Sequence, residues 1–224
     1  MTDTIGQNVK KNTAEAYASP SWWYDIRGCF ILLISYRDTP LPVIAFFARN
    51  LGARHLEIAF GSGTLFELIL KRSIRRNKMI PHVVGIDYAP MMLAGARKRF
   101  AGNPNITLQQ ADATNLDLAD NSFDTVNIAN ALHTIHNPDA VLREIYRVLK
   151  PGKTMAANAL LHPRGPRLLR QWAERVNAWG KRKGILVDSF ELEDIRNRIQ
   201  QVGFTIAEEY VRGNTYNVIV RKPA

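Results

Sequence analysis

The sequence has a single cysteine, Cys29, in 224 residues. One thiol excludes an internal disulfide framework and any zinc site built from several thiolates, and it fits a reducing compartment. Long apolar runs are also missing, since the longest near the N-terminus spans residues 29–36 and falls far short of the roughly 20 residues that a membrane span requires. This run also lacks the flanks of a signal peptide. We therefore expect a cytoplasmic protein with no metal site and no transmembrane helix.

Acidic residues are few relative to basic ones: 20 against 30, which gives a formal net charge of +10 and a pI of about 9.9. The excess favours acidic partners such as nucleic acid, anionic lipid or an anionic small substrate, and charge alone does not choose among them. Seven basic residues and one acid, Glu174, fall within residues 161–184. The apolar residues there share one helical face. This segment is either a helix packed through its tryptophans or a basic aromatic surface that contacts substrate or membrane.

Short β-branched runs alternate with helical patterns from about residue 54 onward. The predicted strands span residues 55–60, 82–87, 106–109, 123–129 and 153–161. The predicted helices span residues 64–77, 90–100, 138–149 and 188–203, the third ended by Pro151-Gly152 and the fourth opened by Asp188 and Glu191 in capping-box spacing. Residues 204–210 and 216–221 are predicted to form an antiparallel pair. The sum is a three-layer, Rossmann-like α/β domain with a mostly parallel seven-stranded sheet and an antiparallel last strand.

The sequence predicts one domain, residues 1–224, with two segments outside the alternating pattern. These segments are residues 1–50 and 161–187, and together they hold all four tryptophans. We expect residues 51–160 to form the ligand-binding core and residues 188–224 to close the sheet. We expect the two outlying segments to cover the bound ligand, as caps that open and close around it.

The turn after the first predicted strand is rich in glycine and reads Ala59-Phe-Gly61-Ser-Gly63. Glycine lets the backbone turn sharply and lets a ligand lie on main-chain atoms at the start of a helix. A dinucleotide fingerprint would need a third glycine, but Thr64 or Phe66 stands at that position in the two registers considered. A pyrophosphate-binding dehydrogenase is therefore disfavoured.

Acidic residues stand at the ends of two successive strands. Asp87 ends the second predicted strand, and Asp112 follows the third. In an open α/β sheet these positions lie beside the first loop, where ligands bind. A carboxylate there can accept both hydroxyls of a ribose and a second can accept an exocyclic amine, whereas two acids suit phosphates poorly. The pair predicts a nucleoside site.

The order and spacing of six motifs resemble those of class I S-adenosylmethionine-dependent methyltransferases, of the type 11 or ubiquinone-methyltransferase-like group. The match covers about residues 54–160, and residues 190–204 resemble the family's last helix and strand. The motifs are Glu57-x-Ala59-x-Gly61-x-Gly63, Val84-Gly-Ile-Asp87-Tyr-Ala-Pro-Met-Met92, Gln110-Ala-Asp112, Ser122-Phe-Asp124, Asn130-Ala-Leu-His133 and Leu142-Arg-Glu-Ile-Tyr-Arg-Val-Leu-Lys150-Pro-Gly152. The resemblance implies a Rossmann-like methyltransferase fold and S-adenosylmethionine as cofactor.

The resemblance also implies which residues hold the nucleoside part of the cofactor. Gly61 and Gly63 would lie under the cofactor, and Asp87 would hold the ribose hydroxyls. Asp112 would meet the adenine amine, with the main chain of Ala113 alongside. These assignments agree with the nucleoside site predicted from the strand ends.

Further cofactor contacts are implied in the same way. Tyr88 and Met92 would flank the adenine, and Asn130 would border the methionine end, near the sulfonium. Tyr24-Asp25 resembles a Tyr-Asp pair that several members carry, in which the tyrosine closes over the cofactor. An aromatic helix packed on the sheet edge is the alternative for this segment.

Two residues of the first motif, Glu57 and Ala59, complete the cofactor set. Ala59 departs from the family, which has glycine at this position. An added Cβ in a tight turn is harmless only if the residue keeps a negative φ. We expect the departure to leave the fold intact and to bear on the affinity for the cofactor.

Methyl transfer from a sulfonium is an in-line displacement, so catalysis should come chiefly from holding the acceptor close to the methyl in a dry site. A hydroxyl or acidic carbon also needs a base. His133 and His136, just beyond the fourth strand, are the candidates, with helix-capping loop histidines as the alternative. Methylation of base C5 is disfavoured because Cys29 precedes the fold. The Asn/Asp-Pro-Pro-aromatic motif of amino-group methylation in nucleic acids is absent, since Asn127-Ile-Ala-Asn130 stands there.

Two functions of different class remain. The first is an enzyme that methylates a small molecule, anionic or not, or a lipid head group, with peripheral contact to a membrane. The second is a basic module that binds nucleic acid or membrane on a degenerate methyltransferase scaffold. Ala59 and the net charge favour the second. The retention of Asp87, Asp112 and the motif order favours the first, which is the function we expect.

Overall fold

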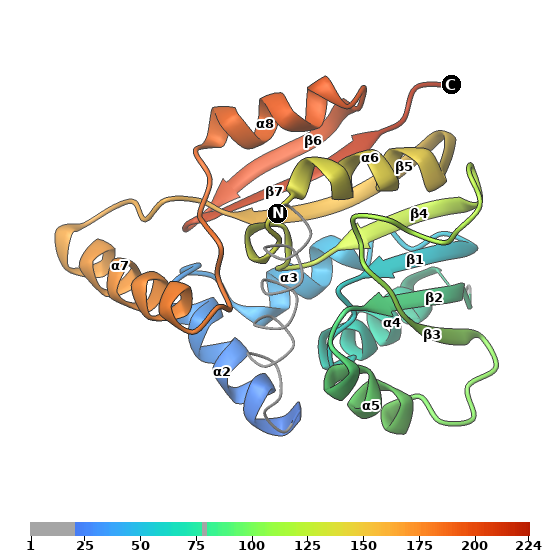
Figure 1. Cartoon of the computed structure of the whole chain (residues 1–224), viewed down its shortest axis with the longest axis horizontal. Helices are drawn as coiled ribbons and strands as arrows, with labels where there is room; N and C mark the ends of the chain where they lie inside the picture. Colours follow the sequence, from blue (N-terminus) through green and yellow to red (C-terminus); the bar gives the residue numbers. More distant parts are fainter. Residues whose placement is uncertain (1–20, 78–79) are drawn as a thin grey trace, which may run out of the picture.

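The computed structural model describes residues 21–77 and 80–224 (Figure 1). Its centre is a seven-stranded sheet of order β3-β2-β1-β4-β5-β7-β6. The last strand of the chain, β7, runs antiparallel to both of its neighbours, and the other pairs are parallel. This confirms the predicted sheet. The strands are β1 Arg54–Ile58, β2 His82–Asp87, β3 Ile106–Gln110, β4 Phe123–Ile128, β5 Leu149–Leu160, β6 Thr205–Arg212 and β7 Thr215–Arg221.

Helices cover both faces of the sheet and give the three predicted layers (Figure 1). On one face, α3 and α4 pack through a cluster that includes Phe47 and Phe66. On the other, α6 and α8 pack through a cluster that includes Leu142 and Ile199. The helices are α2 Ser21–Ile34, α3 Pro40–Phe47, α4 Thr64–Asn77, α5 Pro90–Arg99, the 3-10 helix η1 Leu132–Thr134, α6 Pro138–Val148, α7 Arg167–Arg182 and α8 Leu192–Gln201.

The central strands are buried on both of their faces. Leu56 and Ile58 of β1 and Val126 and Ile128 of β4 pack into one apolar cluster, and the polar residues that alternate with them are buried as well. Burial on both faces is typical of a parallel sheet covered by helices on each side. Because β1, β2, β3 and β4 run parallel to one another, their carboxyl ends meet at one edge of the sheet. Helices α2 and α7 lie side by side beyond that edge (Figure 1).

Two predicted starts, those of β5 and α8, differ from the structure by four residues, and each has a local cause. Strand β5 begins at Leu149, directly after α6, so Pro151 and Gly152 lie within the strand instead of stopping the helix. Helix α8 begins at Leu192, and its N-cap residue makes no side-chain capping bond. The carboxylate of Asp188 is instead held by Lys181 at 2.7 Å, at the end of α7. The capping-box prediction fails because Phe190 pairs with the end of β5, where its N–H donates to the carbonyl of Leu160 at 2.9 Å, so the chain is still extended at this point.

No helix in the described part of the chain is both long enough and apolar enough to cross a bilayer. The segment between β5 and α8 does form a helix, α7, as its periodicity indicates. Trp172 is not packed into the core, however, since it is 56% exposed, whereas Trp179 is half-buried. The residues fully buried on α7 are Ala173, Asn177 and Gly180. Of the two interpretations of this segment, the structure favours an exposed basic aromatic surface.

Candidate active site

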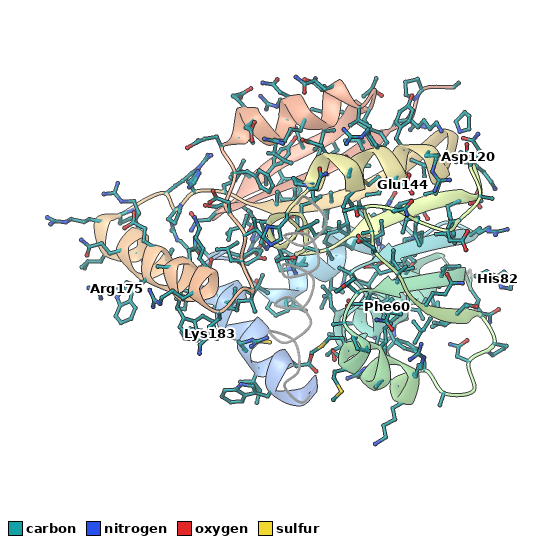
Figure 2. The ribbon with its side chains drawn as sticks, viewed as in Figure 1. Phe60, His82, Asp120, Glu144, Arg175 and Lys183 are labelled. Carbon is teal, nitrogen blue, oxygen red and sulfur yellow. The ribbon has the colours of Figure 1, made fainter. Side chains whose placement is uncertain are left out.

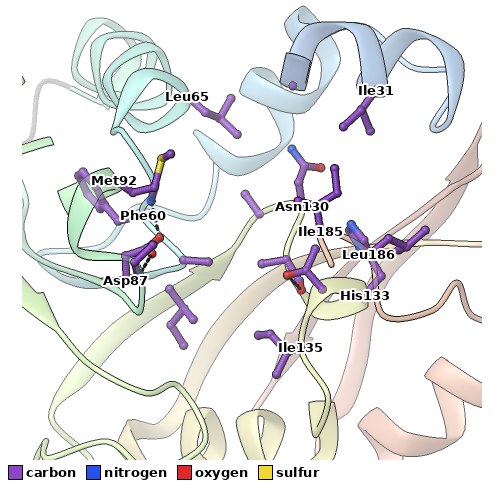
Figure 3. A pocket seen from close by; sticks show the side chains of 18 of the residues that line it. Ile31, Phe60, Leu65, Asp87, Met92, Asn130, His133, Ile135, Ile185 and Leu186 are labelled. Carbon is purple, nitrogen blue, oxygen red and sulfur yellow. Dashed lines mark hydrogen bonds between the residues drawn. The ribbon is translucent and has the colours of Figure 1, made fainter. Parts of the chain in front are cut away.

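A cavity of about 540 Å³ opens at the carboxyl edge of the parallel strands, between the sheet and the helices α2 and α7 (Figure 3). Its volume lies in the range that binds a small organic ligand. The loops that follow β1, β2, β3 and β4 form its floor, and apolar side chains such as Ile31, Leu65 and Leu186 form much of its wall. The cavity is the meeting point of nearly all the residues that the sequence selects.

The glycine loop after β1 leaves open space at one glycine and none at another. Gly61 has a φ of +60°, and a Cβ added there would meet nothing within 4 Å. Gly63 has a φ of +78°, and its added Cβ would come within 2.6 Å of the ring of Phe100 and 2.9 Å of the ring of Phe60. Gly61 therefore keeps room for a ligand, whereas Gly63 allows the loop to pack against α5.

Ala59 adopts a left-handed conformation, with a φ of +57°. The condition for a harmless Cβ at this position is not met, because the left-handed region costs an L-residue roughly 1–2 kcal/mol. Asn130, which follows the neighbouring strand β4 and also lines the cavity, has a φ of +55°. Two adjacent strands thus end in strained non-glycine residues at the same place, as is common at functional sites.

Asp87 stands at the end of β2 with its carboxylate turned toward the glycine loop (Figure 3). It accepts the N–H of Gly61 at 2.7 Å and the N–H of Ala89 at 2.8 Å. Burial raises the pKa of this carboxyl above its usual range, although the backbone donors oppose the shift. A carboxylate offers about four acceptor positions, so Asp87 can accept further hydrogen bonds from a ligand.

Asp112 lines the cavity one strand further out. Its carboxylate accepts the N–H of Thr114 at 2.9 Å and the hydroxyl of Thr114 at 2.7 Å, which fixes the side chain at the start of its loop. Ala113, Tyr88 and Met92 line the cavity as well. The structure therefore brings together the two strand-end acids and the residues expected beside them.

Helix α2 is tied to the glycine loop by one carboxylate. Asp25 accepts the hydroxyl of Ser62 at 2.9 Å and the hydroxyl of Thr64 at 2.7 Å. Asp25 also lines the cavity. The backbone of Tyr24 belongs to α2, but its side chain lies outside the described residues, so its expected contact stays a prediction.

Glu57 does not line the cavity. Its carboxylate is buried within the sheet, 3.0 Å from Nε2 of His55. The Nδ1 atom of His55 lies 2.8 Å from the hydroxyl of Thr125 on the adjacent strand β4. Among the residues selected from the first motif, Glu57 is the one that belongs to a polar network inside the sheet.

His133 is buried in the cavity wall and has a hydrogen-bond partner at each ring nitrogen. Its Nε2 atom pairs with the hydroxyl of Tyr36, and its Nδ1 atom accepts the N–H of Leu160 at 3.3 Å. Acceptance at Nδ1 places the proton of the neutral ring on Nε2. Burial lowers the pKa of His133 to about 3, so the ring is neutral at physiological pH. His136 also lines the cavity but is exposed.

Residues 56–157 match a family described as a methyltransferase domain. These residues contain the glycine loop and both strand-end acids. The match covers just under half of the chain. It agrees with the resemblance of these residues to class I S-adenosylmethionine-dependent methyltransferases of the ubiquinone-methyltransferase-like group.

Similar sequences include several quinone methyltransferases. A demethylmenaquinone methyltransferase of Clavibacter sepedonicus is 38% identical over 101 residues, which are 45% of this chain and 38% of that protein. A 2-phytyl-1,4-naphtoquinone methyltransferase of Thermosynechococcus vestitus is 33% identical over 123 residues, which are 54% of this chain and 53% of that protein. The chain thus spans about half or less of the length of these relatives.

Similar structures share the methyltransferase fold at low sequence identity. A chain from the complex of the Haloferax volcanii Trm112 methyltransferase activator with a methyltransferase has a TM-score of 0.67 at 19% identity, covering 91% of this chain and 97% of that chain. Phosphoethanolamine N-methyltransferase 2 of Haemonchus contortus, in complex with S-adenosyl-L-methionine, has a TM-score of 0.61 at 18% identity. The match covers 82% of this chain and 52% of that chain. The predicted fold is confirmed.

The residues that match the methyltransferase-domain family do not account for the whole cavity wall. Further lining residues come from the two segments outside the alternating pattern, and sequence reasoning did not select them: Ser35, Tyr36, Asn177, Ile185 and Leu186. The hydroxyl of Ser35 donates to the side-chain oxygen of Asn177 and joins α2 to α7. The only signal for these residues in the sequence is that both segments depart from the strand-helix alternation.

Proposed function

We propose that this chain binds S-adenosylmethionine at the carboxyl edge of the sheet and transfers its methyl group to an apolar small molecule. The observation that carries the proposal is the open space beside Gly61, bounded by the carboxylate of Asp87, whose acceptor positions are only partly used. A nucleoside resting on the loop would meet no protein Cβ and would find an acceptor for its ribose hydroxyls.

The proposed contacts follow the strand ends. Asp87 holds the ribose hydroxyls, and Asp112 receives the adenine amine. Tyr88 and Met92 flank the adenine ring, and Asn130 borders the methionine end. All five residues line the same cavity, which supports this assignment.

The charge of the cavity wall also suits this cofactor. Among the described lining residues there are three aspartates and one arginine, Asp25, Asp87, Asp112 and Arg27, and no glutamate or lysine. S-adenosylmethionine carries a sulfonium beside a zwitterionic amino acid end and is therefore a net cation. A wall in which carboxylates outnumber the guanidinium attracts it, even though the whole chain is strongly basic.

The acceptor that we propose is neutral and apolar. The part of the cavity beneath α2 and α7 is lined chiefly by aliphatic side chains, among them Ile31, Leu32, Val176, Ile185 and Leu186. An anionic acceptor would lose its hydration there without gaining a cationic partner for each charge, whereas an apolar one gains from burial. We propose that residues 21–50 and 161–187 act as the caps over this acceptor.

In the proposed reaction, bound S-adenosylmethionine supplies an electrophilic methyl group: the bond from sulfur to the methyl carbon breaks as the bond from the acceptor atom forms. The chain holds the acceptor in line and excludes water. With its pKa near 3, His133 takes up a proton poorly. We propose that it instead orients the hydroxyl of Tyr36 toward the acceptor, and that His136 is the candidate base where the acceptor loses a proton.

Titration calorimetry with S-adenosylhomocysteine tests the site. Loss of two hydroxyl contacts to a carboxylate should cost about 3–6 kcal/mol, so Asp87→Ala should weaken binding at least 100-fold. Asp117→Ala, at an exposed position outside the cavity, is the matched control and should bind as the wild type does. Affinity near that of the wild type in Asp87→Ala, with the variant folded by circular dichroism, would overturn the assignment.

Methyl transfer itself is tested with methyl-labelled cofactor and paired acceptors. Neutral aromatic or isoprenoid acceptors should incorporate label, and carboxylated analogues of the same size should not. Incorporation only into the anionic analogues would show that the cavity prefers an anionic acceptor and would overturn the proposal of a neutral one. The single cysteine supports a reducing compartment, so we place the activity in the cytoplasm.

A contact with membranes is part of the proposal. Seven basic residues and one acid within residues 161–184 give this segment a strongly positive charge, and α7 carries most of them at the surface. Figure 2 shows Arg175 and Lys183 on the outside of the molecule at this helix. Anionic lipid attracts such a segment, with about 1 kcal/mol for each basic residue near the surface.

A further inference from the structure

Helix α2 is apolar on two opposite faces. One face lines the cavity with Gly28, Cys29, Ile31 and Leu32. The other carries Trp23, Ile26, Phe30 and Leu33, which are 49–55% exposed and do not line the cavity. Their spacing of three, four and three residues places them in one stripe along the helix. Large exposed apolar side chains gathered in one stripe are a feature of interaction surfaces.

Helix α7 carries further exposed apolar side chains. Leu168, Leu169 and Trp172 are 72%, 47% and 56% exposed. Helices α2 and α7 pack against each other, and the bond from Ser35 to Asn177 joins their inner faces. We call these three residues and the four of the α2 stripe the apolar rim. Exposed apolar side chains gathered on two helices that pack together mark an interaction site.

Basic side chains are interleaved with the apolar rim. On α7, Arg167 precedes Leu168, Arg170 follows Leu169, and Arg175 lies over the ring of Trp172 at 5.6 Å. The single acid of the helix, Glu174, lies 3.6 Å from Arg170. Apolar side chains that insert at the acyl boundary, flanked by cations that meet phosphate, form the pattern of a helix that lies on an anionic membrane.

We propose that the apolar rim docks on the surface of an anionic bilayer. The cavity lies directly beneath α2 and α7, so docking places it against the lipid and lets an apolar acceptor pass between the two. The docking follows from the exposed surface alone. The passage of the acceptor rests on the proposed function.

Other occupants fit the apolar rim less well. A second copy would bring one basic surface onto another, in a chain with a net charge of +10. Residues 1–20 contain two acids and two lysines, so they offer no net charge to complement the arginines. Nucleic acid would pair with the cations but would leave seven apolar side chains facing phosphate and water.

Vesicle flotation of the full chain tests the docking. Vesicles of phosphatidylcholine with 30% phosphatidylglycerol, about a third anionic, should carry the wild type at low salt. Pure phosphatidylcholine vesicles should carry much less, and raising the salt to about 0.5 M should release the protein because the screening length falls below 10 Å. No binding to the anionic vesicles at low salt overturns the proposal.

Paired variants locate the surface. Ile26→Gln with Phe30→Gln removes half of the α2 stripe, and Arg167→Gln with Arg175→Gln removes two flanking cations; each pair should reduce vesicle binding at least tenfold. The matched controls remove exposed groups elsewhere: Met91→Gln with Val211→Gln for apolar area, and Arg75→Gln with Arg76→Gln for charge. Equal losses in test and control pairs would show general adhesion and overturn the proposal.

Calorimetry with S-adenosylhomocysteine on the same variants separates docking from the proposed function. Flotation needs no cofactor, so vesicle binding without cofactor binding would retain the docking and reject the methyltransferase site. Cofactor binding without flotation would do the reverse. Size-exclusion chromatography tests for a second copy on the same surface. If the wild type elutes as a dimer and the variant with Ile26→Gln and Phe30→Gln as a monomer, the apolar rim is a dimer interface and the membrane proposal is overturned.

Discussion

Asn130 and Asn158 exchange two hydrogen bonds between the ends of the neighbouring strands β4 and β5. The N–H of Asn130 donates to Oδ1 of Asn158 at 2.6 Å, and Nδ2 of Asn158 donates to Oδ1 of Asn130 at 2.7 Å. Asn158 is fully buried. This reciprocal pair holds Asn130 in its left-handed conformation at the cavity wall.

Replacing Asn158 with leucine should therefore destabilise the fold and loosen the site. The change removes both bonds and leaves the N–H of Asn130 without its acceptor, which should lower the free energy of unfolding by about 2–4 kcal/mol. Urea titration measures the loss, and calorimetry should show weaker cofactor binding. A loss below about 0.5 kcal/mol would mean that the pair does not hold the loop.

Ala59→Gly should stabilise the protein. Glycine relieves roughly 1–2 kcal/mol of left-handed strain in the folded chain. It also makes the unfolded chain more flexible, which lowers stability by about 0.4–1 kcal/mol, so the net gain is about 0.5–1 kcal/mol. For a chain of this size the melting temperature should rise by about 1–4 °C. Ala48→Gly is the control, because Ala48 has a φ of −63° and should lose stability on the same change. A fall in the melting temperature of Ala59→Gly would contradict the strain argument.

Gly61→Ala and Gly63→Ala should fail in different ways. Both carry a positive φ, but the new methyl at position 61 enters open space, whereas that at position 63 meets two phenylalanine rings. Gly61→Ala should stay folded with at least 100-fold weaker cofactor binding. Gly63→Ala should lose a further 1–3 kcal/mol or so of stability through overpacking. Thermal melts and calorimetry on both variants decide it, and unchanged cofactor affinity in Gly61→Ala would count against the cradle.

His133 should make stability fall with acid. Its pKa is about 3 in the folded chain against 6.5 for the ordinary side chain, so between these values the unfolded chain binds a proton that the folded chain does not. The contribution is fully present above pH 6.5 and is lost at about 1.4 kcal/mol for each pH unit below it. Urea titrations at pH 7 and pH 5 should show a shallower pH dependence for His133→Leu. An unchanged slope would show that other groups dominate.

The sequence predicts the features that depend on local signals and misses those that depend on contacts between distant residues. The helix at Thr64–Asn77 and the strand at His82–Asp87 have the predicted bounds, because apolar periodicity and flanking turn residues are local signals. Asp87 and Asp112 were predictable as a pair because parallel strands end at one edge. The bonds from Tyr36 to His133 and from Ser35 to Asn177 join residues 97 and 142 positions apart, and no local pattern specifies such partners.

The two hydrogen bonds that Asp25 accepts, from Ser62 and Thr64, link the position of α2 to the conformation of the glycine loop. A ligand that rests on the glycine loop and changes the strength of this tie also changes the free energy of the position of α2. If binding at the outer face of α2 also depends on the position of the helix, thermodynamic reciprocity requires that such binding alters the affinity of the loop by the same factor. Under that condition, ligand binding at the glycine loop and attachment through the outer face of α2 share one coupling free energy, which Asp25 transmits.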